Sequence, residues 1–108
     1  MSDWVDVAAV SDLPPGERIL IDVDDVMIIV LNHEGEFYAI EDLCTHDGGE
    51  LSKGSIIKEE NAIMCPRHGA LFCLKTGNIL EGPGYGPTNT FPVRVEAGTV
   101  QVKDDRWN

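Results

Sequence analysis

The segments Cys44-Thr45-His46 and Cys65-Pro66-Arg67-His68 decide how this chain folds, and eighteen residues (47–64) separate them. Each segment holds one Cys and one His, whose thiolate and imidazole groups are suitable ligands for iron and zinc. A structural zinc site usually takes its ligands as like pairs, Cys with Cys and then His with His. Here Cys and His alternate, with unequal gaps of one and two residues. This order favours a binuclear centre to which each segment gives one ligand per metal ion.

The same pattern, Cys-x-His followed by Cys-x2-His, resembles that of Rieske proteins, which bind a 2Fe-2S cluster through two Cys and two His. Three neighbouring stretches are also similar to the small soluble Rieske ferredoxins: Leu51 to Gly54, His68 to Phe72, and Thr76-Gly77. We therefore expect this chain to share the fold, the cluster ligands and the partners of that family.

Four ligands are implied by the resemblance. Cys44 and Cys65 are expected to bind a buried iron, and His46 and His68 an exposed one. Residues 81–87, rich in Gly and Pro, resemble the third loop that covers the cluster in this family.

The fold class expected is all-β, because short strands and turns recur and no helical period lasts ten residues. Predicted strands cover residues 4–10, 18–23, 27–31, 37–40, 54–58, 62–64, 91–96 and 99–103. The resemblance implies a Rieske-type antiparallel β-sandwich base with a small cluster-binding subdomain inserted into it. We expect a single Rieske domain over residues 1–108, with the cluster-binding part at about 42–87 and the base built from 1–41 and 88–108.

Composition limits the class of partner. The 108 residues suffice for one domain, and their net charge of −11 disfavours binding to nucleic acid or to an anionic membrane. A protein partner is expected instead. The start of the sequence shows no secretory signal, and the longest apolar run, Val26 to Leu31, is far shorter than the roughly 20 residues of a membrane-spanning helix. We therefore expect a cytoplasmic monomer that does not enter the membrane.

The third cysteine, Cys73, lies in the apolar run Leu71 to Leu74 and is predicted to be a small buried core residue. Three cysteines without a secretory signal fit a reducing compartment, in which thiols bind metals instead of forming disulfides. His33 lies in a polar turn and is expected to be solvated.

Catalytic roles are disfavoured. A Rieske oxygenase needs a further iron held by two His and a carboxylate, and only His33 remains after the cluster takes its ligands. Residues 82–86 read G-x-G-x-G with a proline inside, which differs from the G-x-G-x-x-G of a dinucleotide site. The chain is therefore predicted to have no catalytic site of its own and to carry electrons.

The function expected is one-electron transfer from a flavin-dependent reductase to a terminal, aromatic-ring-hydroxylating oxygenase. Two alternatives with the same fold stay open: the small Rieske-like subunit of nitrite reductase, and a Rieske protein of iron-sulfur assembly. From a different class, the same four ligands would also fit a zinc-stabilised interaction module without a redox role.

Overall fold

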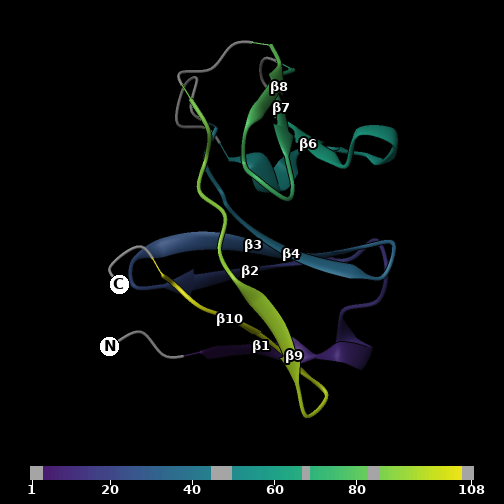
Figure 1. Cartoon of the computed structure of the whole chain (residues 1–108), viewed down its shortest axis with the longest axis vertical. Coiled ribbons are helices and arrows are strands. Elements are labelled where there is room, and N and C mark those ends of the chain that lie inside the picture. The colour runs from purple at the N-terminus through teal and green to yellow at the C-terminus, as the bar shows by residue number, and fades with distance from the viewer. Residues whose placement is uncertain (1–3, 45–49, 67–68, 83–85, 106–108) are drawn as a thin grey trace. The chain divides into compact units, whose positions relative to one another are not determined.

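A computed structural model describes residues 4–44, 50–66, 69–82 and 86–105. Ten antiparallel strands and three short 3-10 helices make up the described chain, which contains no α-helix (Figure 1). The predicted all-β class is thereby confirmed. The chain divides into unit 1, residues 1–39 and 91–108, and unit 2, residues 40–90. Unit 2 is thus inserted between the two sequence segments of unit 1.

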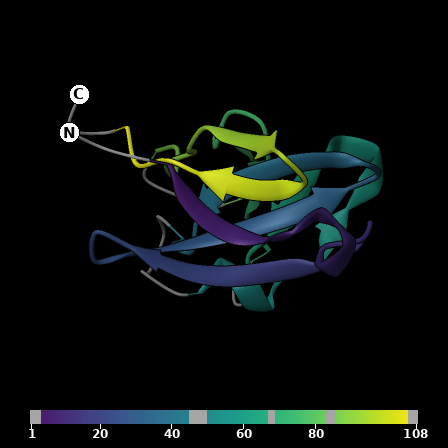
Figure 2. The ribbon, with the colours of Figure 1, turned by 90° about the horizontal axis from the view of Figure 1, so that it is seen from below.

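Unit 1 contains two three-stranded sheets, with strand orders β1-β10-β9 and β2-β3-β4. The first consists of β1 (Val5–Ala9), β10 (Thr99–Val102) and β9 (Val93–Glu96), and the second of β2 (Arg18–Val23), β3 (Val26–His33) and β4 (Glu36–Glu41). A single 3-10 turn, η1 (Val10–Asp12), follows β1. Figure 2 shows the first sheet lying over the second. Because β1 pairs with β10, strands from both ends of the sequence meet in one sheet, as expected.

Two-residue turns set the register of the hairpins. Asp24 and Asp25 both have positive φ, 51° and 66°, and all six residues of β2 pair with β3 around them. A two-residue hairpin loop with positive φ at both positions twists in the same sense as its strands, and Asp tolerates this backbone better than most residues. Ala97 and Gly98 make the corresponding turn between β9 and β10.

The core of unit 1 lies between its two sheets. Its buried members are Leu13, Val23, Ile28, Val30, Ala39, Phe91, Val100 and Val102. In the last hairpin, formed by the two strands predicted there, Val93 faces Val102 and Val95 faces Val100. Val95 nevertheless remains 48% exposed, because β9 is the edge strand of its sheet.

Unit 2 contains a four-stranded antiparallel sheet of order β5-β6-β7-β8. The strands are β5 (Ile56–Ile57), β6 (Ala62–Met64), β7 (Leu71–Cys73) and β8 (Ile79–Glu81), and the 3-10 turns η2 (Leu51–Lys53) and η3 (Lys58–Glu60) precede and follow β5. The strands predicted over 54–58 and 62–64 are present and pair with each other, although the first is shorter than expected. Strands β7 and β8 were not predicted from the sequence.

No helix in the described part of the chain is long and apolar enough to cross a membrane.

Candidate metal centre

Cys44 lies at the start of the first loop, defined here as residues 43–51, which follows β4. Its side chain is fully inaccessible to solvent. The backbone turns directly before it, since the Leu43 amide donates to the Glu41 carbonyl over 2.8 Å. His46 belongs to the same loop but lies outside the described residues.

Cys65 begins the second loop, residues 65–70, which connects β6 to β7. Both backbone groups of Cys65 are engaged within that loop: its amide donates to the Ala70 carbonyl at 2.7 Å, and its carbonyl accepts from the Gly69 amide at 3.0 Å. The Cys65 side chain is 1% exposed. Both bonds fix the backbone of the predicted ligand without using its sulfur. His68 lies outside the described residues.

The bases of the two loops are tied together. Gly54, three residues after the end of the first loop, approaches β6 so closely that a Cβ built on it would lie 1.8 Å from the Met64 carbonyl oxygen. Next to this contact, the Met64 amide donates to the Ser55 carbonyl over 2.9 Å. Met64 directly precedes Cys65, so the segment just after the first loop packs against the residue just before the second. Only a residue without a side chain allows this approach.

Residues of the predicted third loop meet the second loop at Gly82. A Cβ at Gly82 would lie 2.8 Å from the Ala70 Cα. Beyond residue 85, the Thr88 amide donates to the Gly77 carbonyl, and the Glu41 amide donates to the Asn89 carbonyl. The Asn89 side chain returns a hydrogen bond to the Glu41 carboxylate over 2.8 Å. Thr88 and Asn89 are therefore bonded to the β7–β8 turn at Gly77 and to the end of β4 at Glu41.

The two buried cysteines are chemically suited to an iron-sulfur cluster. Neither forms a disulfide, although both are buried in the same unit. Thiolates are the ligands that hold such clusters. Here the backbone is hydrogen-bonded at Cys65 itself and at Leu43, directly before Cys44. Within the described residues, no group of three or more His, Cys, Asp or Glu side chains is gathered at one point. Of the four predicted ligands, the described residues therefore include the two cysteines, Cys44 and Cys65.

Cys73 does not belong to this site, and its predicted burial is wrong. It stands at the far end of β7 from the second loop, paired with Ala62, and its side chain is half-buried. Burial acts to raise the pKa of this thiol. Hydrogen bonds from the Thr76 hydroxyl and from the Thr76 and Lys75 amides, together with the Lys75 charge, outweigh that effect and lower the pKa below its ordinary value. The apolar neighbours of Cys73 in the sequence gave no sign of the following turn.

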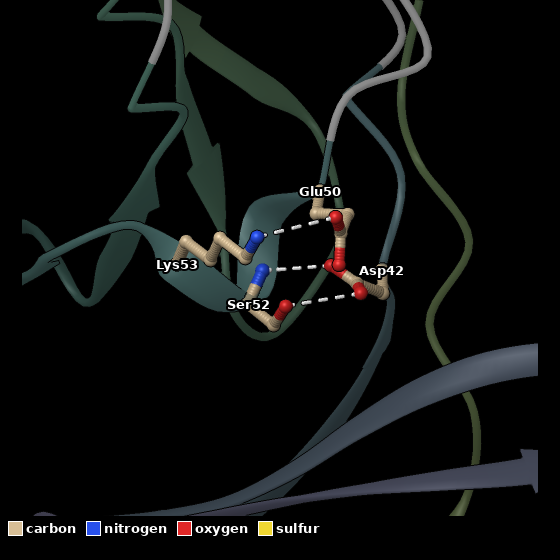
Figure 3. A network of polar contacts seen from close by, with 4 residues as sticks. All are labelled: Asp42, Glu50, Ser52 and Lys53. Atoms are coloured by element: carbon tan, nitrogen blue, oxygen red, sulfur yellow. Dashed lines mark hydrogen bonds and ion pairs between the residues drawn. The ribbon is translucent and has the colours of Figure 1, made fainter.

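Asp42, two residues before Cys44, is a polar residue near the site that was not predicted from the sequence. Its carboxylate accepts two hydrogen bonds from Ser52, ten residues later in the chain (Figure 3). Nothing in the local sequence distinguishes this Asp from a solvated strand end, because the partner is remote.

Comparison with known proteins identifies the family. The Rieske 2Fe-2S domain profile matches residues 3–92. The ferredoxin subunit of 3-phenylpropionate/cinnamic acid dioxygenase from Shigella flexneri is 44% identical over 93 residues, which make up 86% of each chain.

Solved structures agree with this assignment. The ferredoxin of carbazole 1,9a-dioxygenase from Nocardioides aromaticivorans IC177 superposes with a TM-score of 0.86 at 31% identity, over 92% of this chain and 95% of that one. A chain from the complex of reduced oxygenase and oxidized ferredoxin in carbazole 1,9a-dioxygenase gives 0.83 at 36% identity, over 92% and 91%. The predicted resemblance is confirmed: the chain belongs to the Rieske 2Fe-2S domain family, whose cofactor is a Rieske-type 2Fe-2S cluster.

Proposed function

We propose that this chain is a one-electron carrier that delivers electrons to the terminal oxygenase of an aromatic-ring-hydroxylating dioxygenase system. The observation that carries the proposal is the pair of fully buried cysteines, Cys44 and Cys65, at the starts of two loops with joined bases. The acceptor is supported by the relatives, which are named ferredoxin subunits of such dioxygenases, and by the similar chain that stands in a complex with reduced oxygenase.

Within the proposed site, Cys44 and Cys65 would hold one iron and His46 and His68 would hold the other. When bound, the cluster accepts and releases one electron at a time. Two thiolates and two neutral imidazoles place two fewer negative charges around the metal than four thiolates would, which favours the reduced form. Burial of the cysteine side chains keeps water from that half of the site.

The remaining assignments extend the same proposal. A flavin-dependent reductase supplies the electrons, the protein acts as a monomer in the cytoplasm, and units 1 and 2 together form one Rieske domain. Unit 1 provides the base of this domain, and unit 2 provides the cluster-binding part.

Four single substitutions test the site: Cys44→Ser, Cys65→Ser, His46→Ala and His68→Ala. Each leaves an iron under-coordinated, so each purified variant should lose the visible absorption and the Rieske electron paramagnetic resonance signal of the parent. Cys73→Ser is the matched control and should keep both, because this half-buried thiol lies at the other end of β7. A normal Rieske signal in any of the four variants would contradict the ligand assignment.

Reconstitution tests the function. With NADH, a flavin reductase and a ring-hydroxylating oxygenase, hydroxylated product should form only when the parent protein is added, and Cys44→Ser should support none. A colourless parent that contains zinc would favour the zinc-stabilised module. A coloured parent that passes no electrons to the oxygenase would favour the nitrite reductase subunit or the iron-sulfur assembly protein.

A further inference from the structure

A bidentate contact closes the base of the first loop. The Asp42 carboxylate accepts one hydrogen bond from the Ser52 backbone amide at 2.7 Å and another from the Ser52 hydroxyl at 3.0 Å (Figure 3). Both residues are half-buried. Hydrogen bonds to an ionised acceptor are roughly twice as strong as neutral ones, and partial burial limits competition from water.

The position of the contact determines what it does. The first loop, residues 43–51, begins directly after Asp42 and ends directly before Ser52, and Cys44 is two residues from the contact. Without the contact, the two ends of the loop would have to be brought together when the metal centre forms, and that entropic cost would reduce the affinity of the site for its cluster. The two bonds join the ends beforehand.

A second polar contact in the same place provides a comparison. Lys53 and Glu50 form an ion pair of 3.5 Å, but their side chains are 72% and 57% exposed. Figure 3 shows this pair beside the Asp42–Ser52 contact. Exposed ion pairs contribute little because water and salt screen them and because ordering two long side chains costs entropy. The ion pair is therefore not expected to hold the loop.

We propose that Asp42 is a positioning residue for the cluster: its two hydrogen bonds to Ser52 hold the ends of the first loop together and so fix the backbone that leads into Cys44. This inference rests on the proposed role of Cys44 as a ligand. It predicts that the bonds, and not the negative charge of Asp42, determine how long the cluster is retained.

The variants separate bonding from charge. Asp42→Ala removes both bonds and should speed the transfer of iron to EDTA about tenfold or more. Asp42→Asn removes the charge but keeps an oxygen for the Ser52 amide and offers an NH2 group to the Ser52 hydroxyl, so the rate should stay within about threefold of the parent. Lys53→Ala, the matched control, should change the rate less than about twofold.

Two further readouts distinguish positioning from general destabilisation. The resonance signal of the reduced protein should broaden in Asp42→Ala and return to the parental linewidth in Asp42→Asn, with the same far-ultraviolet circular dichroism in all three proteins. In a second pair, Ser52→Ala loses one bond and should release iron faster than the parent, whereas Ser52→Thr keeps both bonds and should not. If Asp42→Ala takes up no cluster, the iron-release rates of Ser52→Ala and Ser52→Thr test the proposal instead.

Each outcome is decisive. The inference would be overturned if Asp42→Ala released iron at the parental rate, or if Asp42→Ala and Asp42→Asn released it equally fast. The cluster assignment would still stand in either case, provided that the parent protein is coloured. Equal acceleration in Lys53→Ala and Asp42→Ala would also overturn the inference. A colourless parent would overturn the cluster assignment and the inference together.

Discussion

Cys73 differs from Cys44 and Cys65 because its side chain is half-buried, whereas theirs are inaccessible. Burial raises the pKa of the Cys73 thiol, but the Thr76 hydroxyl, the Thr76 and Lys75 amides and the Lys75 charge together lower it. The thiolate is the reactive form. Because its pKa is lowered, the Cys73 thiol forms the reactive thiolate at a lower pH than an ordinary cysteine does.

Thr76→Val tests this account. The substitution removes a hydrogen bond that favours the thiolate, so the pKa of Cys73 should rise and its alkylation by iodoacetamide should require a higher pH. Thr76→Ser keeps the hydroxyl and should leave the pH profile unchanged. Mass spectrometry of the peptide that contains Cys73 measures the rate for this thiol alone. A parental profile in Thr76→Val would show that the hydroxyl does not set the pKa.

At the scale of elements, the strands most predictable from the sequence were those with strong local signals. The bounds of β2, Arg18–Val23, match the prediction because an acidic two-residue turn ends the strand. Strands β7 and β8 have three residues each, and a register shift interrupts their pairing. The pairing of β7 with β6 depends on the second loop, which connects them, and no local signal in the sequence marks it.

In the candidate site, too, features with a local signal in the sequence were predictable and contacts between distant residues were not. The alternation of Cys and His, together with the three neighbouring stretches, predicted the family, because ligand chemistry restricts both residue type and spacing. The contacts that join the loops could not be predicted, since Asp42 and Ser52, like Gly54 and Met64, are ten residues apart and no local pattern marks either pair as partners.

Gly54 permits the closest of these contacts, which leads to a prediction about how the loops are joined. Gly54→Ala should destabilise the protein by about 3 kcal/mol, the upper end of typical overpacking costs. The reason is that the Met64 carbonyl is backbone and cannot move without displacing β6. Ser55→Ala is the control: its side chain is exposed, and the bond from the Met64 amide to the Ser55 carbonyl is unaffected.

The midpoint of urea unfolding, followed by circular dichroism, measures the effect of Gly54→Ala, and loss of visible absorption should follow at lower urea. Equal midpoints for Gly54→Ala and Ser55→Ala would mean that β6 and the end of the first loop can separate at little cost.

At the scale of the whole molecule, the negative charge is distributed unevenly between the two units. Unit 1 has twelve acidic and four basic residues, a net charge of −8, and unit 2 has seven acidic and four basic residues, a net charge of −3. A basic partner is therefore attracted more strongly to unit 1 than to the unit that contains the proposed ligands. Such attraction speeds encounters but does not orient unit 2 toward the acceptor, so short-range contacts near the ligand loops must select the productive complex.

Arg67 is the basic residue best placed in the sequence to make such a contact, since it stands between Cys65 and His68. We expect Arg67→Glu to slow electron delivery to the oxygenase by roughly tenfold, the size of effect that one well-placed interface charge produces. Lys58→Glu makes the same change in net charge on the exposed turn η3 and should slow it far less.

Stopped-flow oxidation of the reduced protein by the oxygenase measures both rates, and the cluster spectra should be unchanged. Raising the ionic strength should reduce the loss that the two variants share, because salt screens long-range repulsion. The additional loss in Arg67→Glu should persist, because a contact that excludes water is screened much less. If both rates fell equally and recovered together in salt, net charge alone would govern the encounter, and Arg67 would have no part in orienting the complex.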